Sequence, residues 1–84
     1  MEKIEKLRKN IDEIDDRLVD LLDKRAKVVL EIGILKKKLN IDVSQPQREK
    51  EILERMIKKS NIIKGISVEA IWKEILNACK LVQK

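Results

Sequence analysis

The chain of 84 residues carries 20 Lys or Arg and 15 Asp or Glu, a formal net charge of +5, with no His and a single Cys. This length predicts a single domain over residues 1–84, and the missing His and second Cys argue against zinc sites, Cys–His nucleophile pairs and acid–base catalysis by His. No run reaches the roughly 18 apolar residues of a membrane span. The lone Cys79 and the lack of a targeting segment predict a cytoplasmic location. The positive charge calls for an anionic partner: nucleic acid, a membrane surface or a small polyanion.

Residues 2–39 are predicted to form one long helix, because the segment contains one Gly and no Pro. Apolar residues recur there every three or four positions with charged residues between them, a pattern typical of a helix that packs along one face. They are Ile4, Leu7, Ile11, Ile14, Leu18, Leu21, Val28, Ile32, Leu35 and Leu39. At about 1.5 Å per residue the helix would be about 55 Å long, and it therefore needs a partner along its length.

Two shorter helices are predicted after a connection of β-branched, Asn, Asp, Ser and Pro residues. The second is expected over residues 46–60, with Pro46 in its first turn and a capping box formed by Ser44 and Gln47. The third is expected over residues 68–83, capped by Ser67. The predicted fold class is therefore all-α.

A second copy of the chain is the expected partner of the long helix. The two shorter helices together have about as many residues as the long one, so one chain could fold as an uneven three-helix hairpin. Two chains with their long helices side by side would bury the apolar face more completely, and small domains gain stability in this way. We therefore expect an intertwined homodimer.

Several polar side chains fall on or beside the faces that the helices should bury. They are Arg25 and Lys36 in the first helix, with Arg8 at the edge of its apolar face; Gln45, Arg48 and Glu49 around the start of the second; and Cys79 and Gln83 in the third. Each helix thus directs polar groups toward a common interior.

Taken singly, these residues have structural explanations. Arg25 and Lys36 could extend to solvent or set the register of two paired chains, and Glu49 could form a salt bridge with either. Cys79 could be a small core residue, and Gln83 could face water at a helix end. Taken together, several buried cations with one carboxylate are costly unless further negative charge is supplied. We therefore expect a pocket for a small polyanion, since guanidinium groups suit carboxylates or phosphates.

The order and spacing of these residues resemble the all-helical class of chorismate mutases over nearly the whole chain. The similarity is carried by residues 7–18, 21–25, 31–36 and 47–51. Its most specific part is a series: an Arg in the first helix, an Arg after a Leu-Leu pair, a Lys eleven residues further on, an Arg-Glu pair opening the second helix, and a Gln in the third. In this sequence the series is Arg8, Arg25, Lys36, Arg48 with Glu49, and Gln83.

The resemblance implies conversion of chorismate to prephenate, on the route to phenylalanine and tyrosine, without a metal or cofactor. In this intramolecular Claisen rearrangement one C–O bond breaks while a C–C bond forms. On the resemblance, Arg25 and the Arg8 of a partner chain would clamp the two carboxylates in the reactive conformer, and Arg48 would add positive potential. Lys36 and Gln83 would donate hydrogen bonds to the ether oxygen, where negative charge grows in the transition state.

The resemblance also implies that Glu49 accepts a hydrogen bond from the ring hydroxyl, helped by main chain near Gln45, and that Ile32 and Val82 wall the pocket. Cys79 stands where relatives usually carry Ser or another hydrogen-bonding side chain that helps to hold a carboxylate. Gln45 replaces a residue that is acidic in some members.

Two alternatives stay open at the level of the sequence. A basic helical protein that binds nucleic acid or forms a coiled coil would explain the net charge and the long helix, but it predicts cations on an exposed face. A member of the same fold with weak catalysis would retain the residue pattern.

Overall fold

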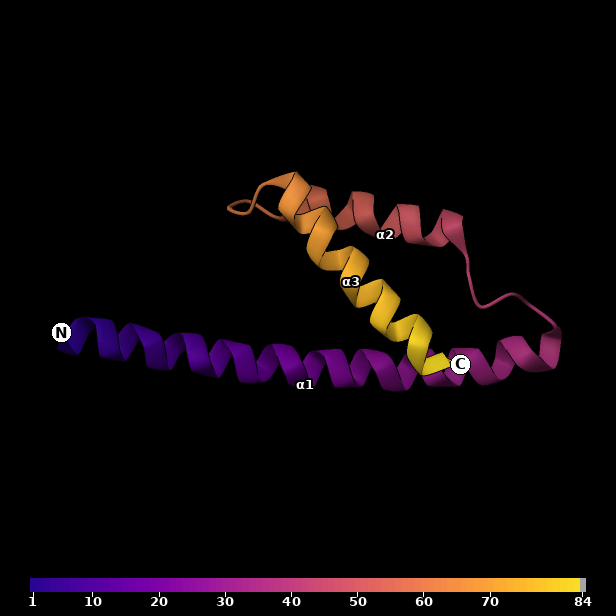
Figure 1. Ribbon diagram of the computed structural model, residues 1–84, viewed down its shortest axis with the longest axis horizontal. Helices are drawn as coiled ribbons and strands as arrows, with labels where there is room; N and C mark the ends of the chain where they lie inside the picture. The colour runs from indigo at the N-terminus through magenta and orange to yellow at the C-terminus, as the bar shows by residue number, and fades with distance from the viewer. Residues whose placement is uncertain (84) are drawn as a thin grey trace.

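The computed structural model describes residues 1–83 and consists of three helices (Figure 1). They are α1 (Glu2–Leu39), α2 (Pro46–Lys59) and α3 (Gly65–Gln83). No strand occurs within residues 1–83, so the all-α prediction is confirmed. None of the three helices combines the length and apolar character that crossing a membrane requires.

The helix α3 holds the fold together. The molecule measures 57 × 24 × 15 Å; α1 runs along the longest dimension, and α3 crosses obliquely from α2 to α1 (Figure 1). In the described part of the chain α3 packs against both other helices, whereas α1 and α2 do not pack on each other. The buried apolar side chains are Ile52, Val68, Leu76 and Cys79, all on α2 and α3. The space between α1 and α2 is therefore walled by α3.

The close approach of α3 to α1 depends on Gly33, the buried residue of α1. A Cβ atom at this position would lie 3.1 Å from Cγ of Gln83 and 3.4 Å from its Cβ. Carbon atoms in ordinary contact are about 3.5–4.0 Å apart, so a larger residue would push the last turn of α3 away. Gly33 thus sets how closely Gln83 approaches the long helix.

The end of α1 is fixed by Asn40, which adopts a left-handed conformation with φ 56° and ψ 40°. The amide of Ile41 donates to the carbonyl of Lys36 at 2.9 Å, and that of Asn40 donates to Lys37 at 3.4 Å. These two bonds form a Schellman motif, which satisfies carbonyl groups that the helix end would otherwise leave unpaired. The motif therefore ends the helix at the turn that carries Lys36.

The starts of the two shorter helices differ from the prediction. The N-cap of α2 is Gln45 and carries no side-chain capping bond, so the capping box of Ser44 and Gln47 is absent; Pro46 occupies the first turn as expected. The helix α3 begins at Gly65, three residues before the predicted start, because the Lys64 carbonyl accepts from the amides of Ser67 and Val68, each at 3.0 Å. Ser67 therefore lies inside the first turn and is not its cap.

The apolar face of α1 is largely uncovered within one chain. Its first turns extend beyond α2 and α3 (Figure 1), and Leu7, Ile11 and Leu18 are 60%, 54% and 53% exposed. An apolar patch of this length is the kind of surface that soluble proteins cover with a partner.

Candidate active site

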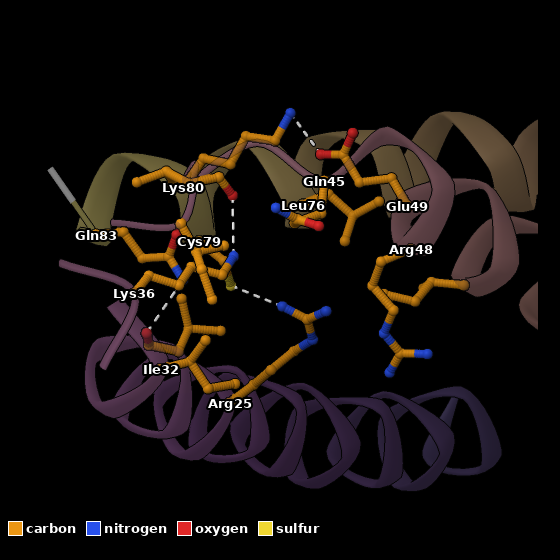
Figure 2. Close-up of a pocket in the computed structure, with 14 residues that line it drawn as sticks. Arg25, Ile32, Lys36, Gln45, Arg48, Glu49, Leu76, Cys79, Lys80 and Gln83 are labelled. Carbon is orange, nitrogen blue, oxygen red and sulfur yellow. Dashed lines mark hydrogen bonds and ion pairs between the residues drawn. The ribbon is translucent and has the colours of Figure 1, made fainter. Parts of the chain in front are cut away.

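A cavity of about 440 Å³ lies between α1, α3 and the start of α2 (Figure 2). Its volume is within the range of pockets that bind small molecules. It is lined by Arg25, Val29, Ile32, Lys36, Ile41, Val43, Gln45, Arg48, Glu49, Ile52, Leu76, Cys79, Lys80 and Gln83. Seven of the eight residues predicted to bind a ligand therefore line one cavity.

Helical periodicity explains how distant positions meet there. The α1 residues that line the cavity recur at positions 25, 29, 32 and 36, and those of α3 at positions 76, 79, 80 and 83. Steps of three or four residues place side chains on one face of a helix. The predicted interior faces of α1 and α3 thus become two walls of the cavity, and the first turn of α2 supplies a third.

The charges that line the cavity are unbalanced. Among the lining residues that the structure describes, four cations, Arg25, Lys36, Arg48 and Lys80, accompany the single carboxylate of Glu49, a formal excess of three positive charges. Concentrating like charges in a concave, partly apolar site raises the local concentration of oppositely charged ligands. The cavity is therefore suited to a small molecule with more than one negative charge.

The guanidinium of Arg25 is oriented without a counter-ion. Its Nη1 donates to Sγ of Cys79 at 3.0 Å (Figure 2), and its Cζ lies 5.7 Å from the centre of the Trp72 ring. No carboxylate of residues 1–83 forms an ion pair with it. A thiol sulfur is a weak acceptor, so these contacts hold the group in place while leaving most of its donors available. Cys79 is thus both a buried core residue and a contact of Arg25, and the role of Trp72 was missed in the sequence.

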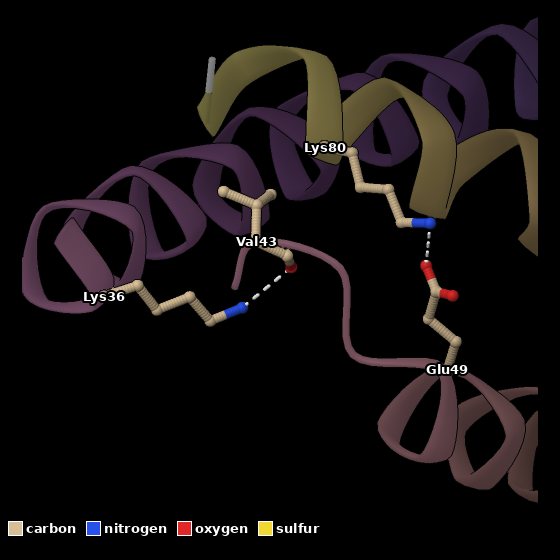
Figure 3. Close-up of polar contacts among 4 residues, drawn as sticks. All are labelled: Lys36, Val43, Glu49 and Lys80. Carbon is tan, nitrogen blue, oxygen red and sulfur yellow. Dashed lines mark hydrogen bonds and ion pairs between the residues drawn. The ribbon is translucent and has the colours of Figure 1, made fainter. Parts of the chain in front are cut away.

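Lys36 and Gln83 are each oriented by a main-chain carbonyl. Nζ of Lys36 donates to the Val43 carbonyl at 3.0 Å (Figure 3), and Nε2 of Gln83 donates to the Val29 carbonyl at 3.1 Å. An ammonium has three N–H donors and a primary amide has two, so each side chain keeps at least one for a ligand. Two hydrogen-bond donors from different helices are thereby fixed at the same end of the cavity (Figure 2).

The partner of Glu49 differs from the one considered in the sequence. Glu49 pairs with Lys80 of α3, and not with Arg25 or Lys36 (Figure 3). Lys80 was not identified in the sequence, although its place one residue after Cys79 and three before Gln83 puts it on the same face of α3. Within residues 1–83, Arg48 pairs only with Glu51 of its own helix, at 3.7 Å and with both side chains more than half exposed, an arrangement that contributes little to stability.

Gln45, Val82 and Arg8, which are also expected at the binding pocket, differ in where the structure places them. The side-chain amide of Gln45 lines the cavity and donates to the Asp42 carbonyl at 3.0 Å. Ile32 lines the cavity, whereas Val82 faces a separate hollow with Leu22, so its predicted place in the wall is wrong. Arg8 is 69% exposed and pairs with Glu5.

Arg8 is far from the cavity of its own chain. It lies seventeen positions before Arg25 on one straight helix, about 25 Å along the axis.

No three His, Cys, Asp or Glu side chains in residues 1–83 are grouped so that they could hold a metal ion.

The profile of the chorismate mutase type II family matches residues 7–84. The chain belongs to this family. A chorismate mutase of Methanocaldococcus jannaschii is 31% identical over the whole of this chain and 87% of its own length. A bifunctional chorismate mutase/prephenate dehydratase of Aquifex aeolicus is 38% identical, and the chain spans a quarter (25%) of that protein's length.

Solved chorismate mutase structures share the fold. Form II of the chorismate mutase from Thermus thermophilus superposes with a TM-score of 0.94 at 28% identity, over 96% of this chain and 93% of that one. Form I of the same enzyme gives 0.88 at 29% identity, over 92% and 98%. Membership of the chorismate mutase family identifies the chain as an isomerase. It favours the hypothesis of a chorismate mutase over that of a nucleic-acid-binding protein.

Proposed function

We propose that the cavity binds chorismate and accelerates its rearrangement to prephenate by holding the reactive conformer and stabilising the charge that develops on the ether oxygen. The observation that carries the proposal is the charge imbalance of the cavity: four cations and one carboxylate line a space sized for one small molecule. A dicarboxylate supplies the missing negative charge, which removes the cost of gathering the cations.

In this proposal the arginines bind and orient the substrate. Arg25, which has no counter-ion in the described residues, binds one carboxylate without first breaking an ion pair, and Arg48 turns from its weak, exposed contact with Glu51 to add positive charge. Fixing both carboxylates brings the enolpyruvyl side chain over the ring, so that entropy lost on binding is not lost again at the transition state.

Lys36 and Gln83 act on the breaking bond. Their main-chain contacts with Val43 and Val29 fix both groups before the substrate arrives. The N–H groups that remain donate to the ether oxygen and strengthen as its negative charge grows, so they favour the transition state over the ground state. At the other side of the cavity, Glu49 accepts a hydrogen bond from the ring hydroxyl, with main chain near Gln45 beside it.

A second copy of the chain completes the site in this proposal. The exposed apolar face of α1 supports such pairing. If two α1 helices pair antiparallel about their midpoints, residue 2 faces residue 39 of the partner and residue 8 therefore faces residue 33. Position 33 lies between Val29 and Lys36, which line the cavity. Arg8, about 25 Å from its own site, would thus reach the partner's site and supply the second clamp.

The reduced thiol of Cys79 supports a cytoplasmic location for the dimer.

The test is to incubate the purified protein with chorismate and to follow the loss of chorismate and the formation of prephenate. We expect a first-order rate above that of the uncatalysed reaction, saturation with substrate, and a sedimentation mass of two chains. A rate equal to that without protein would refute the activity. Turnover by a strictly monomeric protein would refute the shared site and leave the reaction in place.

A further inference from the structure

Lys80 forms a contact that none of the proposed catalytic roles explains. It lines the cavity from α3 and pairs with Glu49 of α2, and the two side chains are 32% and 24% exposed. The other ion pairs within residues 1–83 each join residues of a single helix and are at least 41% exposed. The pair of Lys80 and Glu49 is therefore distinguished by its burial, by its place at the cavity and by the two helices that it joins (Figure 3).

We propose that Lys80 is a positioning residue, which holds the Glu49 carboxylate against α3 and so keeps the cavity arginines available for substrate carboxylates. The inference rests on the proposed function, since it assigns Glu49 to the ring hydroxyl and the arginines to the carboxylates. Figure 2 shows Lys80 and Glu49 meeting on one side of the cavity, with the guanidinium of Arg25 on the other.

The charges of the cavity explain why Glu49 needs such a partner. It is the only carboxylate among the described residues that line the cavity, and Arg25, Lys36 and Arg48 are alternative partners for it. A carboxylate that meets an arginine forms a strong, frequently bidentate pair, which a substrate carboxylate would have to displace. An ammonium is instead a compact point charge. Pairing Glu49 with Lys80 therefore neutralises the carboxylate without occupying a guanidinium.

The contact also orients the carboxylate. Lys80 meets Oε1 of Glu49, and a carboxylate oxygen that takes no part in the pair keeps its full capacity to accept. The second oxygen, Oε2, is thus left to accept the hydroxyl proton of a ligand. Loss of Lys80 would have two results: Glu49 would turn toward an arginine, and the hydroxyl would lose its fixed acceptor.

Steady-state kinetics of three variants test the role. Lys80→Met should lower kcat/KM for chorismate by about tenfold, the effect of one charge-assisted contact, and Lys80→Arg should recover only part of the loss, because a guanidinium that pairs through two N–H groups occupies both oxygens of Glu49. Lys73→Met is the matched control, because Lys73 lies on the same helix and pairs with Glu69 in an exposed contact away from the cavity. It should leave both kinetic constants unchanged. Thermal unfolding followed by circular dichroism should show all three variants folded at the assay temperature.

A double-mutant cycle separates a role of Lys80 that acts through Glu49 from a role that is independent of Glu49. If Lys80 acts through Glu49, then adding Lys80→Met to Glu49→Gln should change kcat/KM by less than about twofold. For variants too slow for initial rates, the Kd for prephenate measured by calorimetry replaces kcat/KM. If the losses of kcat/KM in the two single variants multiply in the double variant, the inference is overturned, because Lys80 would then act independently of Glu49. Wild-type turnover with multiplied losses refutes this inference alone, whereas absence of wild-type turnover refutes the proposed function and this inference with it.

Discussion

Replacing Gly33 by Ala should separate catalysis from stability, because the substitution should lower the rate while leaving the stability nearly unchanged. The new Cβ would lie 3.1 Å from Cγ of Gln83, so the Gln83 side chain and the turn that carries it must give by a few tenths of an ångström to restore ordinary contact. The hydrogen bond from Gln83 to the Val29 carbonyl, now 3.1 Å, is already near the long end of the usual range of about 2.7–3.2 Å and would lengthen and weaken. The amide would then be misplaced for the ether oxygen.

The expected result is a fall in kcat of about 10- to 100-fold, since a shift of an ångström or less in a positioned donor is enough to cost this much. KM should change little, because Gln83 is assigned to the transition state. Stability should be nearly preserved, because Ala is favoured over Gly inside a helix by about 0.5–1 kcal/mol. That gain offsets the displacement of a terminal turn, so we expect Tm to stay within about 5 °C of the wild-type value.

Initial rates with chorismate and thermal unfolding measure the two quantities on the same samples. Gly65→Ala is the matched control: its Cβ would lie 3.2 Å from Cγ2 of Ile57, a similar contact outside the cavity, and kcat should be unchanged. The variant with both Gly33→Ala and Gln83→Ala should be no slower than Gln83→Ala alone. An unchanged kcat for Gly33→Ala, with an unchanged Tm, would show that the position of Gln83 does not matter to the reaction.

Three further changes test other parts of the structure. Lys36→Ala should lower kcat by about 10²- to 10³-fold, as the loss of a donor to a developing oxyanion does. Lys37 is exposed on the same turn, and Lys37→Ala should leave kcat unchanged. Equal effects of the two substitutions on kcat would remove Lys36 from its role. Mixing inactive Arg8→Ala and Arg25→Ala chains should restore about a quarter of wild-type activity, because half of the dimers are mixed and one of their two sites keeps both arginines; no recovery after demonstrated chain exchange would argue against a shared site. Asn40→Val should lower the free energy of unfolding by about 1–2 kcal/mol in urea titrations at fixed chain concentration, because a β-branched residue resists the left-handed conformation. Asn40→Gly should leave the free energy of unfolding unchanged or raise it. Equal losses from both substitutions would contradict the role of the Schellman motif.

The helices and most of the cavity could be predicted because both depend on periodicity within one helix. A polar side chain at an apolar position, such as Arg25 or Lys36, must be near its neighbours on the same face, whatever the tertiary structure. The arrangement of three helices followed from the same pattern together with a Pro and a few turn residues.

The remaining features depend on contacts between helices, which periodicity does not specify. Lys80 was missed because its partner Glu49 lies on another helix, and either of two cations on α1 was an equally reasonable partner in the sequence. Val82 is close to Gln83 in sequence, yet the 100° between successive residues turns it toward a different hollow. The start of α3 was placed at Val68 because a Ser is a common cap, but the Lys64 carbonyl supplied the first hydrogen bonds.

The packing of α3 against both other helices also affects how the chain can fold during synthesis. Within residues 1–83, α1 is synthesised before α2, and α2 makes no packing contact with it. Because a domain generally folds as a unit, α1 would stay an amphipathic segment without tertiary contacts from its own chain until α3 emerges and meets it at Gly33. In this order of synthesis, α1 therefore gains no packing contact with another helix of its own chain until α3 has emerged.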